Sequence, residues 1–277
     1  MSLEITALNS GSNGNCYYIG NDDEAILIDA GISCREVERR MARLGLEMKK
    51  LKAVFISHEH TDHISGLPVL SKKYQLPVYI SSKTEKAARL KLDKKWVHHF
   101  ETDDCIKIGG ISVLAFKKNH DAADPHSFVA SSSTVTIGVF TDIGIACKKV
   151  IQYFKQCHAV FLESNYDTVM LMQGNYPFHL KKRISDGKGH ISNEQALDLF
   201  LSHRPKQLSH LILSHLSQNN NKPELVERLF APHGKGINII VASRYRETAV
   251  YKIEAKYGPR PKLKSIHDQK ALQLKLF

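Results

Sequence analysis

The sequence predicts an α+β or mixed α/β domain in which sheets and helices form layers and loops at one edge carry the chemistry. Short apolar runs separated by turn residues dominate the first half of the chain, as is typical of strands. Segments with helical spacing lie between some of these runs. Polar residues, several of them histidines, follow directly where apolar runs end.

The apolar runs define the predicted strands in order. The first three are joined by residues 10–15 (Ser-Gly-Ser-Asn-Gly-Asn) and 21–23 (Asn-Asp-Asp), which are typical turn sequences. The predicted strands cover residues 4–8, 16–19, 25–28, 53–56, 78–80, 104–108, 112–116, 128–132, 135–141, 159–163 and 211–213.

Capping residues and helical spacing predict the helices. Ser33 begins an S-x-x-E capping box with Glu36, and the helix that follows ends at Gly45. A second capping box runs from Ser192 to Gln195. The other predicted helices cover residues 66–74 and the Lys-rich residues 83–95.

The length of 277 residues is enough for one domain to bury a core without disulfides. The composition changes only after about Lys256, where a Gly/Pro-containing stretch leads into Lys-rich sequence. We therefore expect one folded domain over residues 1–255 and a basic tail over residues 256–277.

The charge balance favours a partner rich in phosphate. Lys and Arg number 39 against 28 Asp and Glu, a net charge of +11, although a positive charge that only keeps the protein soluble is the alternative. No run of about 18 apolar residues predicts a membrane span. The N-terminus resembles no secretory signal, and the five scattered cysteines form no C-x-x-C pair, so we expect a cytoplasmic protein without a thiolate zinc site.

Residues 58–63, His-Glu-His-Thr-Asp-His, are the strongest chemical signal. His58 and His60 lie two apart in an extended segment, so both side chains point to one side and can bind one metal ion. Asp62 and His63 follow just beyond and can face a second ion. Imidazole and carboxylate ligands suit zinc, iron, nickel or manganese in an open catalytic site. The alternative is a solvated, histidine-rich turn.

These six residues resemble the signature of the metallo-β-lactamase superfamily, an αββα sandwich with a binuclear metal site. Residues 10–16 (SGSNGNC), 120–125 (HDAADP) and 213–218 (LSHLSQ) are similar to one branch, the YycJ/WalJ (VicX-like) group of bacterial metal-dependent exonucleases. The likeness extends over most of the chain. It implies a DNA exonuclease with 5′-to-3′ polarity.

By position, the resemblance implies the remaining metal ligands. His120 matches the third histidine of the first ion, with His126 as a competitor, while Asp142 matches the bridging carboxylate and His215 the last ligand of the second ion. The implied set is His58, His60 and His120 on one ion, Asp62, His63 and His215 on the other, and Asp142 between them. Two divalent ions, zinc or manganese with iron or nickel as alternatives, would activate a water that Asp62 orients.

The resemblance also implies a proton donor. His190 lies just before the capping box at Ser192 and is similar to the Gly-His-Ser/Thr element of ribonuclease Z-like phosphodiesterases, whose histidine is a general acid. A structural loop histidine is the alternative. Tyr166 stands where relatives carry histidine, so a role for this position is open.

Five residues are predicted to bind substrate: Ser12, Asn15, Asn165, Lys182 and Arg183. Ser12 and Asn15 belong to the turn that lines the metal cleft in this branch, although an ordinary hairpin turn would read the same way. Asn165 follows a strand near the expected cleft. Lys182 and Arg183 could receive a backbone phosphate, but charge runs more often lie on solvated faces.

The net charge, the His190 segment and the branch motifs favour a nuclease that acts on DNA. A small-molecule hydrolase of the glyoxalase II or lactonase kind shares the His-x-His-x-Asp-His site and is an alternative class. An RNA-processing nuclease is a further alternative, and a non-catalytic DNA-binding module is disfavoured by the complete ligand set.

The tail ends in Gln273-Leu274-Lys275-Leu276-Phe277, which resembles the short peptide by which bacterial replication and repair proteins bind the sliding clamp. The leucines and the phenylalanine would supply apolar anchors, and the glutamine would supply hydrogen bonds. The alternative is a C-terminal element whose leucines pack on the domain.

Overall fold

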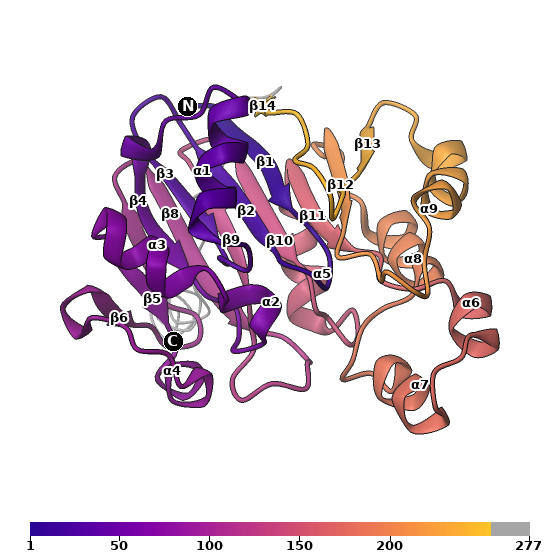
Figure 1. The fold of residues 1–277 in the computed structure, drawn as a ribbon. Coiled ribbons are helices and arrows are strands. Elements are labelled where there is room, and N and C mark those ends of the chain that lie inside the picture. The colour runs from indigo at the N-terminus through magenta and orange to yellow at the C-terminus, as the bar shows by residue number, and fades with distance from the viewer. Residues whose placement is uncertain (256–277) are drawn as a thin grey trace, which may run out of the picture.

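The computed structural model describes residues 1–255, and two β-sheets stacked face to face form its centre (Figure 1). Helices cover the outer face of each sheet, so the predicted αββα sandwich is confirmed. The predicted tail and its peptide, residues 273–277, lie outside the described residues. Within the described part, no helix is both long and apolar enough to cross a membrane.

The first sheet is antiparallel on one side and parallel on the other. Its strands are β1 (Leu3–Asn9), β2 (Cys16–Gly20), β3 (Ala25–Ile28), β4 (Leu51–Phe55), β5 (Val78–Ile80), β6 (Val97–His99) and β14 (Tyr251–Ile253). They lie in the order β14-β1-β2-β3-β4-β5-β6, and pairing is antiparallel up to β3 and parallel from β3 to β6.

The second sheet repeats this arrangement. Its strands are β7 (Cys105–Ile108), β8 (Ile111–Lys117), β9 (His126–Ser131), β10 (Thr136–Phe140), β11 (Ala159–Glu163), β12 (His210–Ser214) and β13 (Asn238–Val241). They lie in the order β13-β12-β11-β10-β9-β8-β7. Pairing is antiparallel from β7 to β10 and parallel from β10 to β13.

The helices follow the strands that they cover. Those of the first half are α1 (Cys34–Arg43), α2 (Thr61–Ile64), α3 (Leu67–Tyr74) and α4 (Ser82–Ala88). Those of the second half are α5 (Lys148–Phe154), α6 (Thr168–Gln173), α7 (Phe178–Ser185), α8 (Asn193–His203) and α9 (Pro223–Phe230). Short 3₁₀ turns are η1 (Met48–Lys50), η2 (Lys94–Trp96) and η3 (Ala231–His233).

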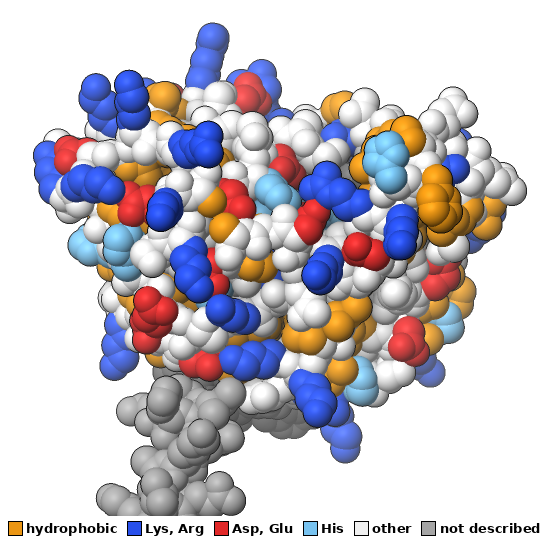
Figure 2. Space-filling model, turned by 90° about the horizontal axis from the view of Figure 1, so that it is seen from below, with side chains coloured by type: hydrophobic (Ala, Val, Ile, Leu, Met, Phe, Trp, Pro, Cys, Tyr) orange, Lys and Arg blue, Asp and Glu red, His pale blue; other side chains and the backbone are white. Residues whose placement is uncertain are grey.

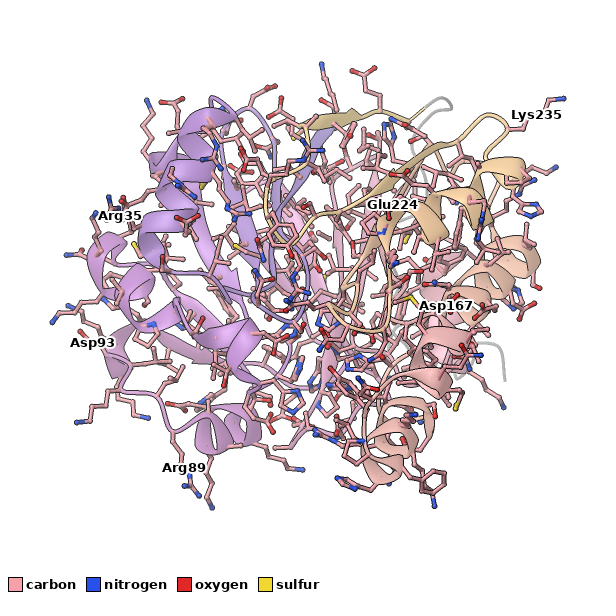
Figure 3. The ribbon with its side chains drawn as sticks, turned by 45° about the vertical axis from the view of Figure 1, so that its right-hand side comes forward. Arg35, Arg89, Asp93, Asp167, Glu224 and Lys235 are labelled. Carbon is pink, nitrogen blue, oxygen red and sulfur yellow. The ribbon has the colours of Figure 1, made fainter. Side chains whose placement is uncertain are left out.

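Apolar side chains hold the layers together. Between the sheets, the rings of Tyr17 and Phe161 lie 4.9 Å apart and those of Phe55 and Phe128 lie 5.8 Å apart. Helices α1 and α3 pack on the first sheet, and α5, α8 and α9 pack on the second. Charged side chains such as Arg35 point away from these layers (Figure 3).

Two predicted helix features differ from the structure. The Lys-rich helix predicted over residues 83–95 ends at Ala88, because Arg89 adopts a left-handed conformation and Leu90 and Leu92 turn back to pack on the outer core of the first sheet. The capping box at Ser192 has both halves, as predicted. At Ser33 the hydroxyl accepts from the Glu36 backbone N–H, but the Glu36 carboxylate pairs with Arg39 and Arg40 instead.

The parallel strands of both sheets end at the edge near α2 and α7 (Figure 1). Asp29 directly follows β3, Asp142 is the second residue after β10, and His215 directly follows β12. All three have a positive φ, of 61°, 53° and 57° respectively, so the chain turns sharply there. Seen from this side, Lys and Arg side chains are spread over the face, with acidic and hydrophobic side chains among them (Figure 2). The candidate site therefore opens onto a face of mixed character that carries many basic side chains.

Candidate metal centre

Three histidines from two loops form the first ligand cluster. His58 Nε2 lies 3.1 Å from His60 Nδ1, and His120 Nε2 lies 3.3 Å from the same atom. The three ligand atoms all lie within 4.8 Å of one another. Nitrogen atoms that face one point at this spacing form one side of a metal coordination sphere.

Neighbouring groups fix which nitrogen of these rings faces the cluster. His120 Nδ1–H donates to the Gly189 carbonyl oxygen at 2.9 Å, which leaves Nε2 free. His58 Nδ1 lies 2.8 Å from Ser57 Oγ, which leaves its Nε2 free as well. Such partners orient a histidine and set its tautomer for metal binding.

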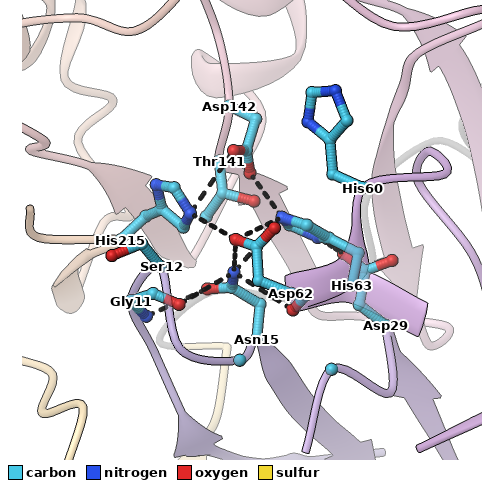
Figure 4. A network of polar contacts seen from close by, with 12 residues as sticks. Gly11, Ser12, Asn15, Asp29, His60, Asp62, His63, Thr141, Asp142 and His215 are labelled. Atoms are coloured by element: carbon cyan, nitrogen blue, oxygen red, sulfur yellow. Dashed lines mark hydrogen bonds and ion pairs between the residues drawn. The ribbon is translucent and has the colours of Figure 1, made fainter. Parts of the chain in front are cut away.

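Asp62, His63 and His215 form the second ligand cluster (Figure 4). Asp62 Oδ2 lies 3.4 Å from His63 Nε2 and 3.3 Å from His215 Nε2. His63 lies in α2, which follows β4 of the first sheet, and His215 follows β12 of the second, so the sandwich itself brings this cluster together.

Asp142 lies between the two clusters. Its Oδ2 lies 3.3 Å from His63 Nε2, and its Oδ1 lies 3.4 Å from His215 Nε2 and 3.9 Å from His120 Nε2. The side chain is buried, and Oδ2 has no hydrogen bond among the described residues. A buried carboxylate oxygen that accepts no hydrogen bond is costly, and a divalent cation would remove that cost. The predicted ligand set therefore fits two divalent ions.

The two clusters differ in charge. In the first, burial lowers the pKa of His120 to about 4, so its imidazole is in the neutral form that binds metal. In the second, burial disfavours a charged His215, but the carboxylates of Asp142, Asp62 and Glu163 together outweigh burial and raise the pKa of His215 to about 10. The carboxylates that favour this proton would favour a divalent cation in its place, because metal binding to a histidine displaces the proton.

Asp29 is a buried carboxylate of the site that the sequence motifs did not reveal. Its Oδ2 accepts from His63 Nδ1 at 2.7 Å and from Ser57 Oγ at 2.8 Å. Through Ser57, it also reaches His58 of the first cluster. Its position directly after a predicted strand, at the same edge of the sheet as the ligands, could have identified Asp29 as a site residue.

Glu163 is a second missed residue, and it holds the proposed proton donor. Its Oε1 accepts from His190 Nδ1 at 2.7 Å and lies 3.4 Å from His215 Nδ1, while Oε2 accepts from the Ile143 backbone N–H at 2.8 Å. Burial raises the pKa of Glu163, but the charge of His190 and its hydrogen bond outweigh burial and lower it. His190 is therefore fixed at the rim of the second cluster by a buried carboxylate.

A cleft of about 240 Å³ opens beside the two clusters. Its walls include Ser12, His60, His120, Asn165, Arg183, His190 and His215. Arg183 donates to Asp121 Oδ2 at 2.5 Å, and Asn165 Nδ2 donates to the His215 carbonyl oxygen at 2.8 Å. Three of the five predicted substrate-binding residues thus line the cleft.

The other two lie elsewhere. Asn15 is fully buried beneath the second cluster, where its Nδ2 lies 3.1 Å from Asp62 Oδ2 and 3.2 Å from His63 Nε2. That position orients a ligand and does not face the cleft. Lys182 is exposed on α7 and is not part of the cleft wall.

His126 and Tyr166, whose part in the site the sequence left undecided, lie apart from the ligand clusters of the described residues. His126 Nε2 lies 3.0 Å from Thr102 Oγ1, and its Nδ1 donates to the Asp124 carbonyl oxygen at 2.8 Å. Tyr166 is buried and bridges to Ser192 through its backbone. Neither faces the site.

Known proteins share this fold and much of this sequence. The family model described as "Metallo-beta-lactamase superfamily" matches residues 10–137. Exodeoxyribonuclease YycJ of Bacillus anthracis is 35% identical over 230 residues, 81% of this chain and 86% of that protein. Exodeoxyribonuclease WalJ of Streptococcus pneumoniae is 30% identical over the same shares. The crystal structure of YhfI from Bacillus subtilis, 17% identical, has a TM-score of 0.69 over 91% of this chain and 100% of that chain.

The sandwich, its paired ligand clusters and these relatives define a metal-dependent hydrolase, and the chain belongs to the metallo-β-lactamase superfamily. Within that superfamily, the exodeoxyribonucleases YycJ and WalJ match most of this chain's length at 30% identity or more. The resemblance seen in the sequence is thereby confirmed.

Proposed function

We propose that this protein is a binuclear metal-dependent exonuclease that degrades DNA from the 5′ end. One observation carries the proposal: Asp142 joins two ligand clusters beside a cleft where His190 is held by a buried carboxylate. The relatives named exodeoxyribonucleases support DNA as the substrate, and so does the net charge of +11. Zinc and manganese are the metals that we propose.

When bound, two divalent ions would polarise the scissile phosphodiester and lower the pKa of the attacking water. Asp62 orients that water. Its Oδ2 accepts a hydrogen bond from Asn15 Nδ2 at 3.1 Å, and Asn15 Oδ1 in turn accepts from the Tyr17 hydroxyl at 3.1 Å and the Gly11 backbone N–H at 3.1 Å. The amide is therefore fixed with its N–H₂ toward Asp62.

His190 supplies the proton that the leaving oxygen needs. Because Nδ1–H donates to Glu163 Oε1, Nε2 is the nitrogen left to hold a proton toward the cleft. The buried Glu163 carboxylate accepts this hydrogen bond and keeps the ring in that orientation. General-acid assistance of this kind contributes about 10²–10⁴-fold in rate.

The test compares nucleic acids and small esters side by side. Purified protein is given single- and double-stranded DNA and RNA, each labelled at the 5′ or the 3′ end, with Mn²⁺ or Zn²⁺ titrated. We expect 5′-labelled DNA to release labelled mononucleotide from the first time point. His58→Ala and Asp142→Ala should each lose nearly all turnover, while the exposed control Asp93→Asn keeps it.

Three results would contradict the proposal. Wild-type rates in both ligand variants would show that the site is elsewhere. Preference for RNA would favour an RNA-processing nuclease. Rapid hydrolysis of a lactone or thioester, with inert nucleic acid, would favour a small-molecule hydrolase.

A further inference from the structure

The loop between β13 and β14 lies against the turn that forms one wall of the cleft. Ser10 N–H donates to the Ser243 carbonyl oxygen at 3.2 Å, and Asn13 Nδ2 donates to the Arg244 carbonyl oxygen at 2.9 Å. Gly11 permits this approach, because a Cβ there would lie 3.1 Å from Arg244 Cβ. The loop therefore places its side chains at the rim of the cleft.

Arg244 has hydrogen-bonding capacity that the described residues do not use. Its Nη2 donates to Ser12 Oγ of the cleft wall at 3.1 Å. Its Nη1 is buried and has no hydrogen-bond partner in the described part, which also provides no carboxylate partner for this guanidinium. A buried donor without a partner is costly, and the planar fork of a guanidinium matches the oxygens of a phosphate.

Tyr245 presents an aromatic ring to solvent next to that guanidinium. The residue is 74% exposed, and the Arg244 guanidinium carbon lies 6.0 Å from its ring centre. Its backbone is held on both sides, because Tyr245 N–H donates to Ser243 Oγ at 3.1 Å and the buried Arg40 donates to the Tyr245 carbonyl oxygen at 3.3 Å.

The rest of the loop is anchored as well. Glu247 accepts two hydrogen bonds from Arg43, at 2.7 and 2.6 Å, and Thr248 N–H donates to the Ala7 carbonyl oxygen at 3.0 Å. An exposed aromatic ring on a fixed backbone loses little freedom when a base stacks on it. The loop is thus preorganised for binding.

We propose that Arg244 binds a backbone phosphate and that Tyr245 stacks on a base of the single-stranded DNA that extends from the cleft. This inference rests on the proposed nuclease function and adds the contact that distinguishes a polymer from a small ester. A small phosphodiester that fills only the cleft gains nothing from a stacking surface at its rim.

The test measures KM for a short single-stranded oligodeoxynucleotide and for bis(p-nitrophenyl) phosphate. Tyr245→Ala should raise KM for the oligonucleotide about tenfold, and at least fivefold more than for the small ester. Tyr245→Phe keeps the ring and should restore most of the loss. Arg244→Gln should reduce the slope of log affinity against log salt by about 0.7. Arg35→Gln on the outer surface of α1 removes the same charge and is the matched control.

The outcomes separate this inference from the function on which it rests. Wild-type protein that degrades DNA, with variants that keep wild-type KM and salt slope, overturns the inference alone. Equal KM increases on the oligonucleotide and the small ester also overturn it, because they indicate a distorted cleft. Wild-type protein that neither binds nor degrades single-stranded DNA overturns the proposed function first and this inference with it.

Discussion

Glu163 couples the proposed proton donor to the metal ligands, because its Oε1 lies 2.7 Å from His190 Nδ1 and 3.4 Å from His215 Nδ1. We predict that Glu163→Gln and His190→Ala each lower kcat about 100-fold or more, with a smaller change in KM. The double variant should be no slower than the slower single one, since the two groups act as a unit.

Steady-state kinetics on a short single-stranded oligodeoxynucleotide, whose leaving oxygen needs a proton, with metal analysis of each variant, checks this. His190→Ala should retain its metal content, and loss of metal from this variant would identify His190 as a ligand. Multiplicative losses in the double variant would contradict the coupling.

Asp29 acts on both ligand clusters through His63 and, by way of Ser57, through His58. We predict that Asp29→Asn weakens metal binding at both sites, by about 10–100-fold each, because the two imidazoles lose the partner that orients them. Competition with a coloured chelator measures both affinities, and Asp93→Asn is the control. Loss of one ion with full retention of the other would contradict a shared role.

The sequence predicted the proposed metal ligands better than the residues that orient those ligands and the proton donor. His58, His60, Asp62 and His63 stand in one recognisable string, so a one-dimensional pattern is enough to find them. The role of Glu163 depends on β10 and β11 pairing in parallel, which places it beside the turn that carries Asp142. That register exists only in the folded sheet.

At the level of elements, a close contact between glycines joins the Asp142 turn to the segment that carries His190. A Cβ on Gly144 would lie 2.2 Å from the Gly187 carbonyl oxygen, and one on Gly189 would lie 2.3 Å from the Arg183 carbonyl oxygen. Both obstacles are backbone atoms, so neither can move without shifting the segment.

We predict that Gly144→Ala lowers kcat at least tenfold and the free energy of unfolding by about 1–3 kcal/mol, because the added methyl group displaces the His190 segment. Kinetics and chemical denaturation of the same preparation check both values. Wild-type kcat together with wild-type stability would contradict the contact.

Buried apolar strands were predicted more accurately than exposed elements, whatever their length. The strand predicted over residues 159–163 is β11 to the residue, because a continuous apolar run marks a strand buried on both faces. Strands β6, β13 and β14 were not predicted, since they are short and partly exposed and carry no clear alternation. The prediction that a helix reaches residue 95 was wrong, because packing of Leu90 and Leu92 on the core overrides local helix propensity.

For the stability of the whole molecule, the two ligand clusters matter because they bury charged groups, and one of these, Asp142, has a carboxylate oxygen without a hydrogen bond in the described residues. We predict that a strong chelator lowers Tm by about 10 °C or more and that added Mn²⁺ or Zn²⁺ restores it, because ions that bind only the folded state stabilise it by mass action. Thermal denaturation with and without chelator measures the shift. Asp142→Ala should lose most of this response, and an unchanged wild-type Tm would contradict a metal-stabilised fold.

The left-handed backbone at Asp142 has an evolutionary consequence. Glycine adopts this conformation with less strain than aspartate, so exchanging Asp142 for glycine removes a functional carboxylate and relaxes the turn in the same step. Where metal is scarce, selection for stability alone would therefore favour inactive descendants that keep the sandwich. Only selection on the catalysed reaction keeps this aspartate in place, and a library screened for thermal tolerance in chelator should lose it first.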